Sequence, residues 1–223
     1  MMWEALQITF TLALITTFIL LLVGVPLAYA LAQSKSKLKP FIETIVTLPL
    51  VLPPTVLGFY MLLAFGKSGW MGKWLYDAFN IQLVFSFSGL IVASVIYSLP
   101  FMVQPLQSGF EQLPKKYREA SLCLGKSGWE TFFKVELPNI KPALLTAVIL
   151  SFAHTIGEFG VVLMIGGNLP GKTKVASIAV YEAVEKMEYT DAHFLSLLLL
   201  LFSFSILFIV YRFNRNGFKI LNR

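Results

Sequence analysis

A long uncharged stretch, Ala5 to Ala32, constrains this chain more than any other feature of its sequence. An α-helix rises about 1.5 Å per residue, so about 20 apolar residues suffice to cross the hydrocarbon core of a bilayer. Four further apolar stretches alternate with short charged ones, and only 13% of all residues are charged, against about 25% in soluble domains. The sequence therefore predicts an all-α integral membrane protein with five transmembrane helices. The predicted spans are about 5–33, 42–66, 81–111, 142–166 and 193–213 of a single domain, residues 1–223, with a long loop at 111–141.

Composition also bears on other classes of protein. The single cysteine, Cys123, excludes an internal disulfide. The net charge of +6 is compatible with nucleic-acid binding, but the basic residues lie in short connections between apolar stretches and form no stripe with aromatic residues. We therefore expect a lipid membrane around this chain and no nucleic acid, and we expect neither a metal site nor a cofactor.

Lysine and arginine residues indicate which side of the membrane each connection faces. The first connection holds Lys35, Lys37 and Lys39, the third holds Lys115, Lys116, Arg118, Lys126, Lys134 and Lys141, and the C-terminal tail holds Arg212, Arg215, Lys219 and Arg223. With five spans, these three regions share one side and contain most of the basic residues. Because basic residues collect on the cytoplasmic side, the N-terminus is predicted to lie outside and the C-terminus in the cytoplasm. Trp70 and Trp74 in the second connection are typical of a membrane interface.

Prolines recur inside the predicted spans and include Pro49, Pro53 and Pro54 in the second. Each removes a backbone donor and tends to kink its helix. Neighbouring helices often accommodate such kinks in membranes. The other interpretation is a bent helix beside the pore, with free carbonyl groups along Leu48-Pro49-Leu50-Val51-Leu52-Pro53-Pro54. The residues favour neither interpretation over the other.

The connection from Glu111 to Lys141 is far longer than the two to eight residues usual between bundle helices. The sequence predicts two short helices in it. The first follows Pro114 and is capped by Gly125; the second begins at the capping box Ser127-Gly128-Trp129-Glu130 and ends at Pro138. Helices this short need a surface to pack against. The residues leave two surfaces open, the bilayer and a groove on a partner protein.

Within this connection, Glu119-Ala120-Ser121, three residues, Gly125, nine residues and Val135-Glu136-Leu137-Pro138 follow one another. This spacing resembles the EAA loop of ABC importer permeases, whose pattern is EAA, three residues, G, nine residues and I-x-L-P. Ser121 and Val135 are the two departures. The resemblance implies the type I ABC importer permease fold, in which this loop is a coupling helix seated in an ATP-binding subunit. It implies that the contact residues are Glu119, Ala120, Ser121, Gly125, Leu137 and Pro138.

Two other segments narrow the resemblance. Leu48-Pro49-Leu50-Val51-Leu52-Pro53-Pro54-Thr55-Val56-Leu57-Gly58 is similar to the second span of molybdate permeases. Ile156-Gly157-Glu158-Phe159-Gly160, followed by Asn168-Leu169-Pro170-Gly171-Lys172-Thr173, is similar to the signature of the molybdate and sulfate permease group. The resemblance implies a subunit that translocates molybdate or tungstate across the bacterial inner membrane, with sulfate or thiosulfate as the alternative cargo. ATP hydrolysis would belong to a partner, so the chain itself is expected to be no enzyme.

The same resemblance implies partners and further site residues. The partners are a second copy in a homodimer, two cytoplasmic ATP-binding subunits and a periplasmic or lipid-anchored molybdate-binding protein. The pore or gate residues would be Pro49, Pro53, Pro54, Thr55, Gly157, Glu158 and Gly160. The residues that dock the binding protein would be Asn168, Pro170 and Gly171.

Two patterns point to other functions. The segment 166–173 satisfies the phosphate-loop pattern G-x-x-x-x-G-K-[ST], but that motif requires a preceding strand, and after a membrane span we interpret it as a turn. His154 and Glu158 share a helix face, as in an enzyme or a proton-coupled secondary carrier, but no nucleophile, metal-ligand cluster or inverted repeat accompanies them. Glu158 is still an ionisable group at membrane depth, which favours a functional role. We expect it to pair with His154, to stay protonated or to bond to a neighbouring helix.

Overall fold

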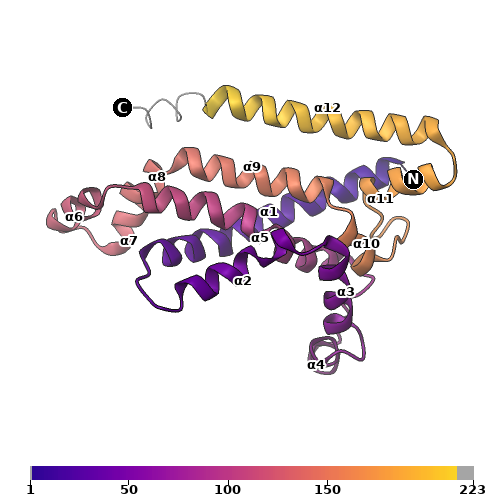
Figure 1. Ribbon diagram of the computed structural model, residues 1–223, viewed down its shortest axis with the longest axis horizontal. Coiled ribbons are helices and arrows are strands. Elements are labelled where there is room, and N and C mark those ends of the chain that lie inside the picture. The colour runs from indigo at the N-terminus through magenta and orange to yellow at the C-terminus, as the bar shows by residue number, and fades with distance from the viewer. Residues whose placement is uncertain (1, 215–223) are drawn as a thin grey trace.

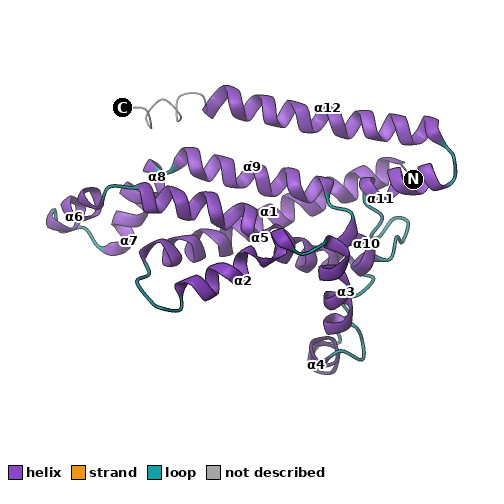
Figure 2. Ribbon diagram, viewed as in Figure 1, coloured by secondary structure: helices purple, strands orange, loops and turns teal. Residues whose placement is uncertain are grey.

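The computed structural model describes residues 2–214, and every regular element in this range is helical (Figures 1 and 2). The long helices are α1 (Met2–Gln33), α5 (Phe87–Gln112), α9 (Lys141–Gly157) and α12 (Tyr189–Asn214). The shorter elements are α2 (Lys39–Val51), α3 (Pro54–Phe65), α4 (Trp70–Phe79), α6 (Lys115–Cys123), α7 (Gly128–Thr131), the π-helical turn η1 (Phe132–Glu136), α8 (Leu137–Asn139), α10 (Gly160–Gly166) and α11 (Ala176–Glu185). The predicted all-α architecture is confirmed. Of the basic tail, Arg215, Lys219 and Arg223 lie outside the described residues.

Three long helices, α1, α5 and α9, pack along one another and form the core (Figure 1). The close approach of α1 and α5 depends on Gly24, because a β-carbon there would lie 2.6 Å from Cγ of Met102. Gly109 has the same role between α5 and α9, where an added β-carbon would lie 2.7 Å from Cβ of Ala143. Small residues at helix contacts are typical of membrane bundles, in which van der Waals packing holds the helices together.

Candidate membrane spans can be counted from helix length and composition. Three helices qualify alone: α1, α5 and the part Tyr189–Phe208 of α12. Two bent pairs qualify together: Lys39–Val51 with Pro54–Phe65, at 113°, and Gly128–Asn139 with Lys141–Gly157, at 75°. The described residues thus hold three candidate spans, or five if each bent pair crosses once. The five predicted spans therefore remain a prediction.

The second predicted span is interrupted by a sharp bend. Helix α2 ends at Val51, Leu52 and Pro53 are extended with ψ angles of 136° and 135°, and α3 starts at Pro54. The cause is local, because a residue that precedes proline is disfavoured in the helical region, and both Leu52 and Pro53 precede one. Pro49 stays inside α2 and is buried. The bend is compatible with both interpretations of these prolines, so a position beside the pore stays a prediction.

The third and fourth predicted spans differ from the helices in their bounds. Helix α5 begins at Phe87, six residues beyond the predicted start, where the Ser86 hydroxyl caps it by accepting a hydrogen bond from the Gly89 amide at 3.1 Å. The fourth stretch is not one continuous helix. Helix α9 ends at Gly157, Glu158 is extended with a ψ angle of 134°, and α10 starts at Gly160. Glycine has low helix propensity, which favours an interruption between these two positions.

The long connection folds into a hairpin, residues 115–139, much as predicted. Gly125 follows α6 with a φ angle of +77°, and both hydrogen bonds of the Ser127 capping box are formed. The helix ends at Asn139, one residue after the predicted end at Pro138. Proline has no N–H group, and the turn before it widens so that the Leu137 amide bonds to the Phe132 carbonyl in π-helical register.

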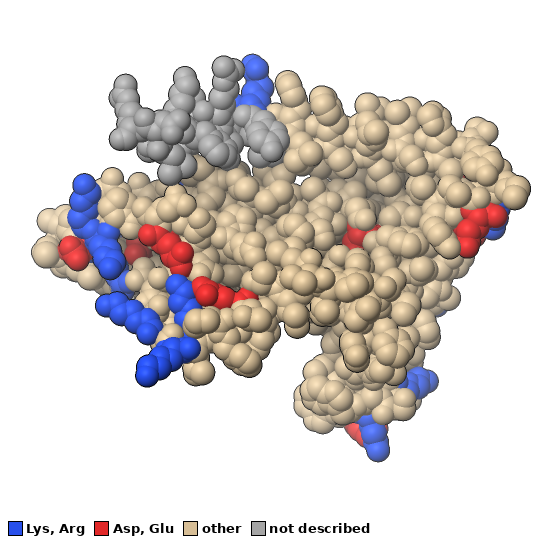
Figure 3. Space-filling view, in the orientation of Figure 1, with Lys and Arg blue, Asp and Glu red and all other residues tan. Residues whose placement is uncertain are grey.

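Charged side chains gather mainly at the ends of the bundle (Figure 3). The largest group of basic side chains covers the end formed by α6, α7 and the turn between α1 and α2. Smaller groups lie at the tip of α4 and at the far end, near the turn between α11 and α12. The broad surface between these groups is almost free of charge, as expected of a protein surrounded by hydrocarbon.

Candidate functional site

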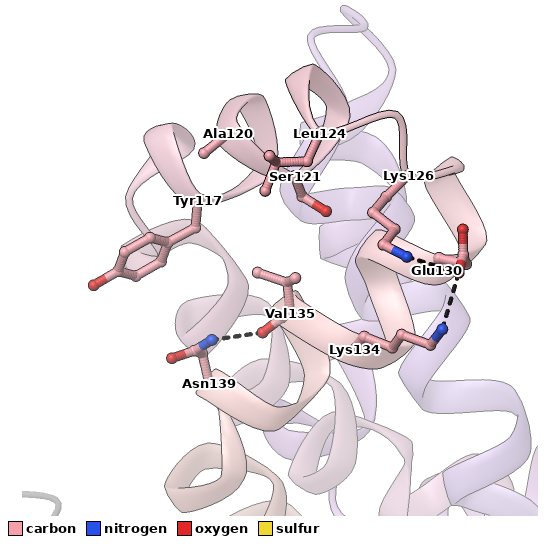
Figure 4. A pocket seen from close by; sticks show the side chains of 9 residues that line it. All are labelled: Tyr117, Ala120, Ser121, Leu124, Lys126, Glu130, Lys134, Val135 and Asn139. Carbon is pink, nitrogen blue, oxygen red and sulfur yellow. Dashed lines mark hydrogen bonds and ion pairs between the residues drawn. The ribbon is translucent and has the colours of Figure 1, made fainter.

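The hairpin encloses an open groove of about 490 Å³ at the charged end of the bundle (Figure 4). The lining residues are Tyr117, Ala120, Ser121, Leu124, Lys126, Glu130, Lys134, Val135 and Asn139. Helix α6 forms one wall, and α7 with η1 forms the other. The groove thus lies between the two short helices that were predicted to need a surface to pack against.

Internal polar contacts hold the two walls in place. The hydroxyls of Ser121 and Thr131 are buried and lie 2.9 Å apart, which ties α6 to α7. On the second wall, the Lys134 ammonium donates to Glu130 at 2.9 Å, and Lys126 lies 3.6 Å from the same carboxylate oxygen (Figure 4). The hairpin is therefore a preformed unit with one charged rim.

Large apolar side chains beside the groove are exposed. Leu124 is 81% exposed and Trp129 is 76% exposed, and the Trp129 ring stacks on Phe133 at 6.0 Å between ring centroids. Tyr117 and Phe133 are also exposed. Exposed aromatic side chains beside a groove mark a surface that binds a protein partner or a membrane. The arrangement favours docking over chemistry.

The residues assigned to this contact by the sequence do not all meet at the groove. Ala120 and Ser121 line it, with Ser121 buried beneath it. Glu119 is exposed on α6, and Gly125 shapes the turn that joins the walls. Leu137 packs against the core of the bundle, and Pro138 is exposed beyond η1, so neither lines the groove.

Sequence reasoning missed the charged rim of Lys126, Glu130 and Lys134. The signal was present, because these residues recur at intervals of four, the spacing that brings opposite charges together on a helix. It also missed Glu136, which is only 2% exposed. Its burial could not be read from the pattern, because it depends on contact with a distant helix.

The predicted gate residues are partly brought together. Gly160 at the start of α10 lies against the bend between α2 and α3, where an added β-carbon would be 2.8 Å from Cβ of Pro54 and 3.3 Å from the Thr55 nitrogen. Pro53 and Thr55 are exposed at the same bend. Gly157, in contrast, is exposed with nothing within 4 Å of an added β-carbon. Pro49 lies in α2, before the bend.

Glu158 and His154 each bond to a serine of α5 and not to each other. The Ser94 hydroxyl donates to Oε2 of Glu158 at 2.7 Å, and Ser98 Oγ lies 2.9 Å from Nδ1 of His154. The His154 ring stacks on Phe101, with 4.0 Å between centroids. The suggested pairing of the two residues is therefore wrong, and the bond to a neighbouring helix is confirmed. Oε1 of Glu158 is buried without a hydrogen-bond partner.

The segment 166–173 is a turn, as interpreted, and α10 rather than a strand precedes it. The Thr173 hydroxyl donates to the Gly166 carbonyl at 2.6 Å and accepts from the Leu169 amide at 3.0 Å. Asn168 has a φ angle of +55°, and its Nδ2 donates to Oε2 of Glu182 at 3.3 Å. Pro170 and Gly171 are exposed at the tip. A docking site at this loop is thus geometrically available.

Glu182 on α11 anchors this loop and was missed in the sequence. Its carboxylate forms ion pairs with both Lys174 and Lys186 and accepts from Asn168. The hydrogen bonds from Lys174 and Lys186 hold the pKa of this carboxyl at about 2, well below its usual 4.5. A carboxyl whose pKa is lowered in the folded state stabilises that state above pH 4.5, and this contribution is lost as the pH falls towards 2.

We therefore expect Glu182→Gln to lower the Tm of the detergent-solubilised protein at pH 7. The difference from wild type should shrink as the pH falls from 4.5 towards 2, because protonation removes the same charge from the wild type. Asp77→Asn, at an exposed position of α4, serves as control and should leave the Tm unchanged at every pH. A difference for Glu182→Gln that stays constant down to pH 2 would contradict the assignment.

Among the described residues, no group of three or more His, Cys, Asp or Glu side chains is placed to hold a metal ion. The polar clusters described above are instead the hairpin groove, two serine-bonded side chains inside the bundle and a charged anchor beneath a loop.

Comparison with known proteins agrees with this geometry. Residues 21–219 match the family described as "Binding-protein-dependent transport system inner membrane component". The chain is 50% identical to the molybdenum transport system permease protein ModB of Azotobacter vinelandii, over 95% of this chain and 93% of that protein. It is 37% identical to a probable sulfate transport system permease protein, cysT, of Chlorella vulgaris, over 82% of this chain and 68% of that protein.

A solved structure is similar in fold. A chain of a bacterial ABC transporter that imports the acidic polysaccharide alginate superposes with a TM-score of 0.78. The match covers 96% of this chain and 78% of that one, with 16% sequence identity. At this identity the likeness concerns the fold alone.

Proposed function

Because this chain belongs to the family of inner membrane components of binding-protein-dependent transport systems, we propose that it is the permease subunit of an ABC importer for molybdate or tungstate. The chain is the non-catalytic membrane component of such a system. The observation that carries the choice of anion is the 50% identity to a molybdenum transport permease along nearly the whole length of both chains. Sulfate is the alternative cargo, and the 37% identity to the probable sulfate permease supports it.

The spans suit a conduit better than a binding site. No Lys or Arg lies inside the predicted spans away from their ends, so no salt bridge holds an oxyanion at mid-membrane. Hydroxyl groups and backbone dipoles remain as the groups that can contact the oxyanion. Weak binding favours release, since a tightly held anion would stall transport. Selection of the anion would then belong to the external binding protein.

The partners follow from the two ends of the molecule. The hairpin groove and the apolar side chains beside it would seat an ATP-binding subunit, with Glu119, Ala120 and Gly125 at the contact. Basic residues concentrate at this end, which supports a cytoplasmic position for it, with the N-terminus outside and the C-terminus inside. The loop with Asn168, Pro170 and Gly171 lies at the opposite end and would dock the binding protein. Two copies of the chain with two ATP-binding subunits complete the transporter.

The contact between Gly160 and Pro54 is the best supported position for a gate. It joins two interruptions, the bend between α2 and α3 and the break between α9 and α10. Helix interruptions at membrane depth occur where backbone groups line a cavity or are buried in protein. Glu158 lies at this break and is bonded to α5, so we assign it a structural role there and no contact with the anion.

The test is uptake into liposomes that hold this chain, its ATP-binding subunits and the loaded binding protein. We expect molybdate and tungstate to be accumulated only when ATP is present, and excess sulfate to compete weakly. Uptake of sulfate alone would overturn the anion assignment. Accumulation that proceeds without nucleotide, driven by a pH gradient, would overturn the class of transporter and favour a proton-coupled carrier.

A further inference from the structure

Tyr29 and Glu136 connect the hairpin to the membrane bundle, although they are 107 residues apart in sequence. The Tyr29 hydroxyl, near the end of α1, donates to Oε2 of Glu136 in η1 at 2.9 Å. Glu136 is 2% exposed, so its carboxylate has left bulk water. Burying such a group costs free energy unless it is hydrogen-bonded, and the Tyr29 hydroxyl supplies a bond.

The ring of Tyr29 also lies at the centre of an aromatic cluster. It packs edge to face against Phe110 of α5, at 5.1 Å between centroids, and against Phe132 of η1, at 4.8 Å. Phe110 and Phe132 stack on each other at 6.0 Å. One side chain of α1 thus contacts α5 through its ring and the hairpin through both its ring and its hydroxyl.

The widened turn before Pro138 accounts for the position of Glu136. Glu136 and Phe132 are the last and first residues of η1, and both are buried towards the bundle. Single π-helical turns are frequent at functional positions, because they redirect side chains that a regular helix would place elsewhere.

We propose that the hydrogen bond between Tyr29 and Glu136 is a strut that transmits movement of the hairpin to α1 and α5. This inference rests on the proposed function, because it assigns the movement to an ATP-binding subunit seated on the hairpin. Aromatic packing alone tolerates sliding, whereas a hydrogen bond has a fixed direction and length and keeps the register of the two parts. Tyr29 and Glu136 are therefore positioning residues for transport.

The test is Tyr29→Phe in the complete transporter, which keeps the ring and removes the hydroxyl. We expect the number of anions imported per ATP hydrolysed to fall about tenfold, which is the order expected for loss of one hydrogen bond to a charged group. ATP hydrolysis and assembly with the ATP-binding subunits should stay within about twofold of wild type, since the aromatic cluster remains. Glu136→Gln keeps an acceptor and should retain most of the coupling, whereas Glu136→Leu should behave as Tyr29→Phe does.

The matched control is Tyr181→Phe. Tyr181 also donates to a glutamate, Glu185, at 2.8 Å, but both residues are exposed on the single helix α11. The same chemical change there should leave the ratio unchanged. If Tyr29→Phe leaves the number of anions imported per ATP hydrolysed unchanged, or if ATP hydrolysis and uptake fall equally, the proposed role of this hydrogen bond is contradicted.

A second measurement does not depend on which anion is carried. Spin labels on the native exposed Cys123 and on Lys35→Cys report the distance between the hairpin and the end of α1. We expect one narrow distance distribution in wild type, with and without trapped ATP, and a broad one in Tyr29→Phe. If the wild-type transporter carries neither molybdate nor tungstate, the proposed function fails. These distances still test whether the Tyr29–Glu136 hydrogen bond holds the hairpin against α1. Equally narrow distributions in both proteins would refute it.

Discussion

Arginine in place of Ala120 should abolish ATP-driven uptake while leaving the membrane protein folded. Ala120 is exposed and lines the groove, so its replacement meets no packed neighbour in the isolated chain (Figure 4). In the assembled transporter the same position would be covered, and a bulky charge in the centre of an interface typically costs roughly 2–4 kcal/mol, or about 30- to 1000-fold in affinity. The measurements are retention of the ATP-binding subunits during purification and uptake into liposomes.

Leu122→Arg is the matched control for this variant. Leu122 lies on the same helix, is exposed, and does not line the groove. It should therefore keep both the partner subunits and most of the uptake. Equal losses in the two variants would mean that α6 as a whole, and not its groove face, carries the contact. Full activity of Ala120→Arg would remove the hairpin from the coupling pathway.

Valine in place of Gly160 should lower the stability of the protein and impair uptake. An added β-carbon at Gly160 would lie 2.8 Å from Cβ of Pro54, closer than two carbon atoms approach without displacement. Pro54 is the first residue of α3 and cannot move without shifting the bend between α2 and α3. Overpacking of this kind costs about 1–3 kcal/mol, which corresponds to a fall in Tm of about 2–12 °C.

Gly157→Val tests the same substitution three residues earlier in the chain. Gly157 is exposed, and nothing lies within 4 Å of an added β-carbon. Its Tm should stay within about 2 °C of wild type, because surface substitutions usually change stability by less than about 0.5 kcal/mol. If Gly157→Val blocks uptake without lowering the Tm, the exposed side of the break lies on the translocation path. If Gly160→Val is as stable and as active as wild type, the close contact with Pro54 does not hold the gate.

The parts of this protein that could be predicted from the sequence are those with a local cause. Helix α1 follows from an uncharged stretch longer than a bilayer requires. The turn at Gly125 and the capping box at Ser127 are local too, since each depends on residues within one helical turn. The bend at Leu52 is specified by the two prolines that follow it.

The bounds of the fourth predicted span and the contacts of its polar residues were harder to predict from the sequence. Glu158 and His154 are four residues apart, which suggested a pair, yet each bonds to a serine of α5. Ser94 is 64 residues from Glu158 in sequence. Spacing along one helix specifies which side chains share a face, but the partner of that face depends on how the helices are packed.

The sequence by itself determined that this chain is a helical membrane protein with a long charged hairpin between apolar stretches, because periodicity, caps and prolines act within a few residues. Only the tertiary structure decided that Gly160 lies against Pro54, that Asn168 and Lys174 reach Glu182, and that Tyr29 reaches Glu136. These contacts join different elements, and only the packing of those elements against one another brings their residues together. Their energies depend on burial and direction, which distance along the chain does not encode.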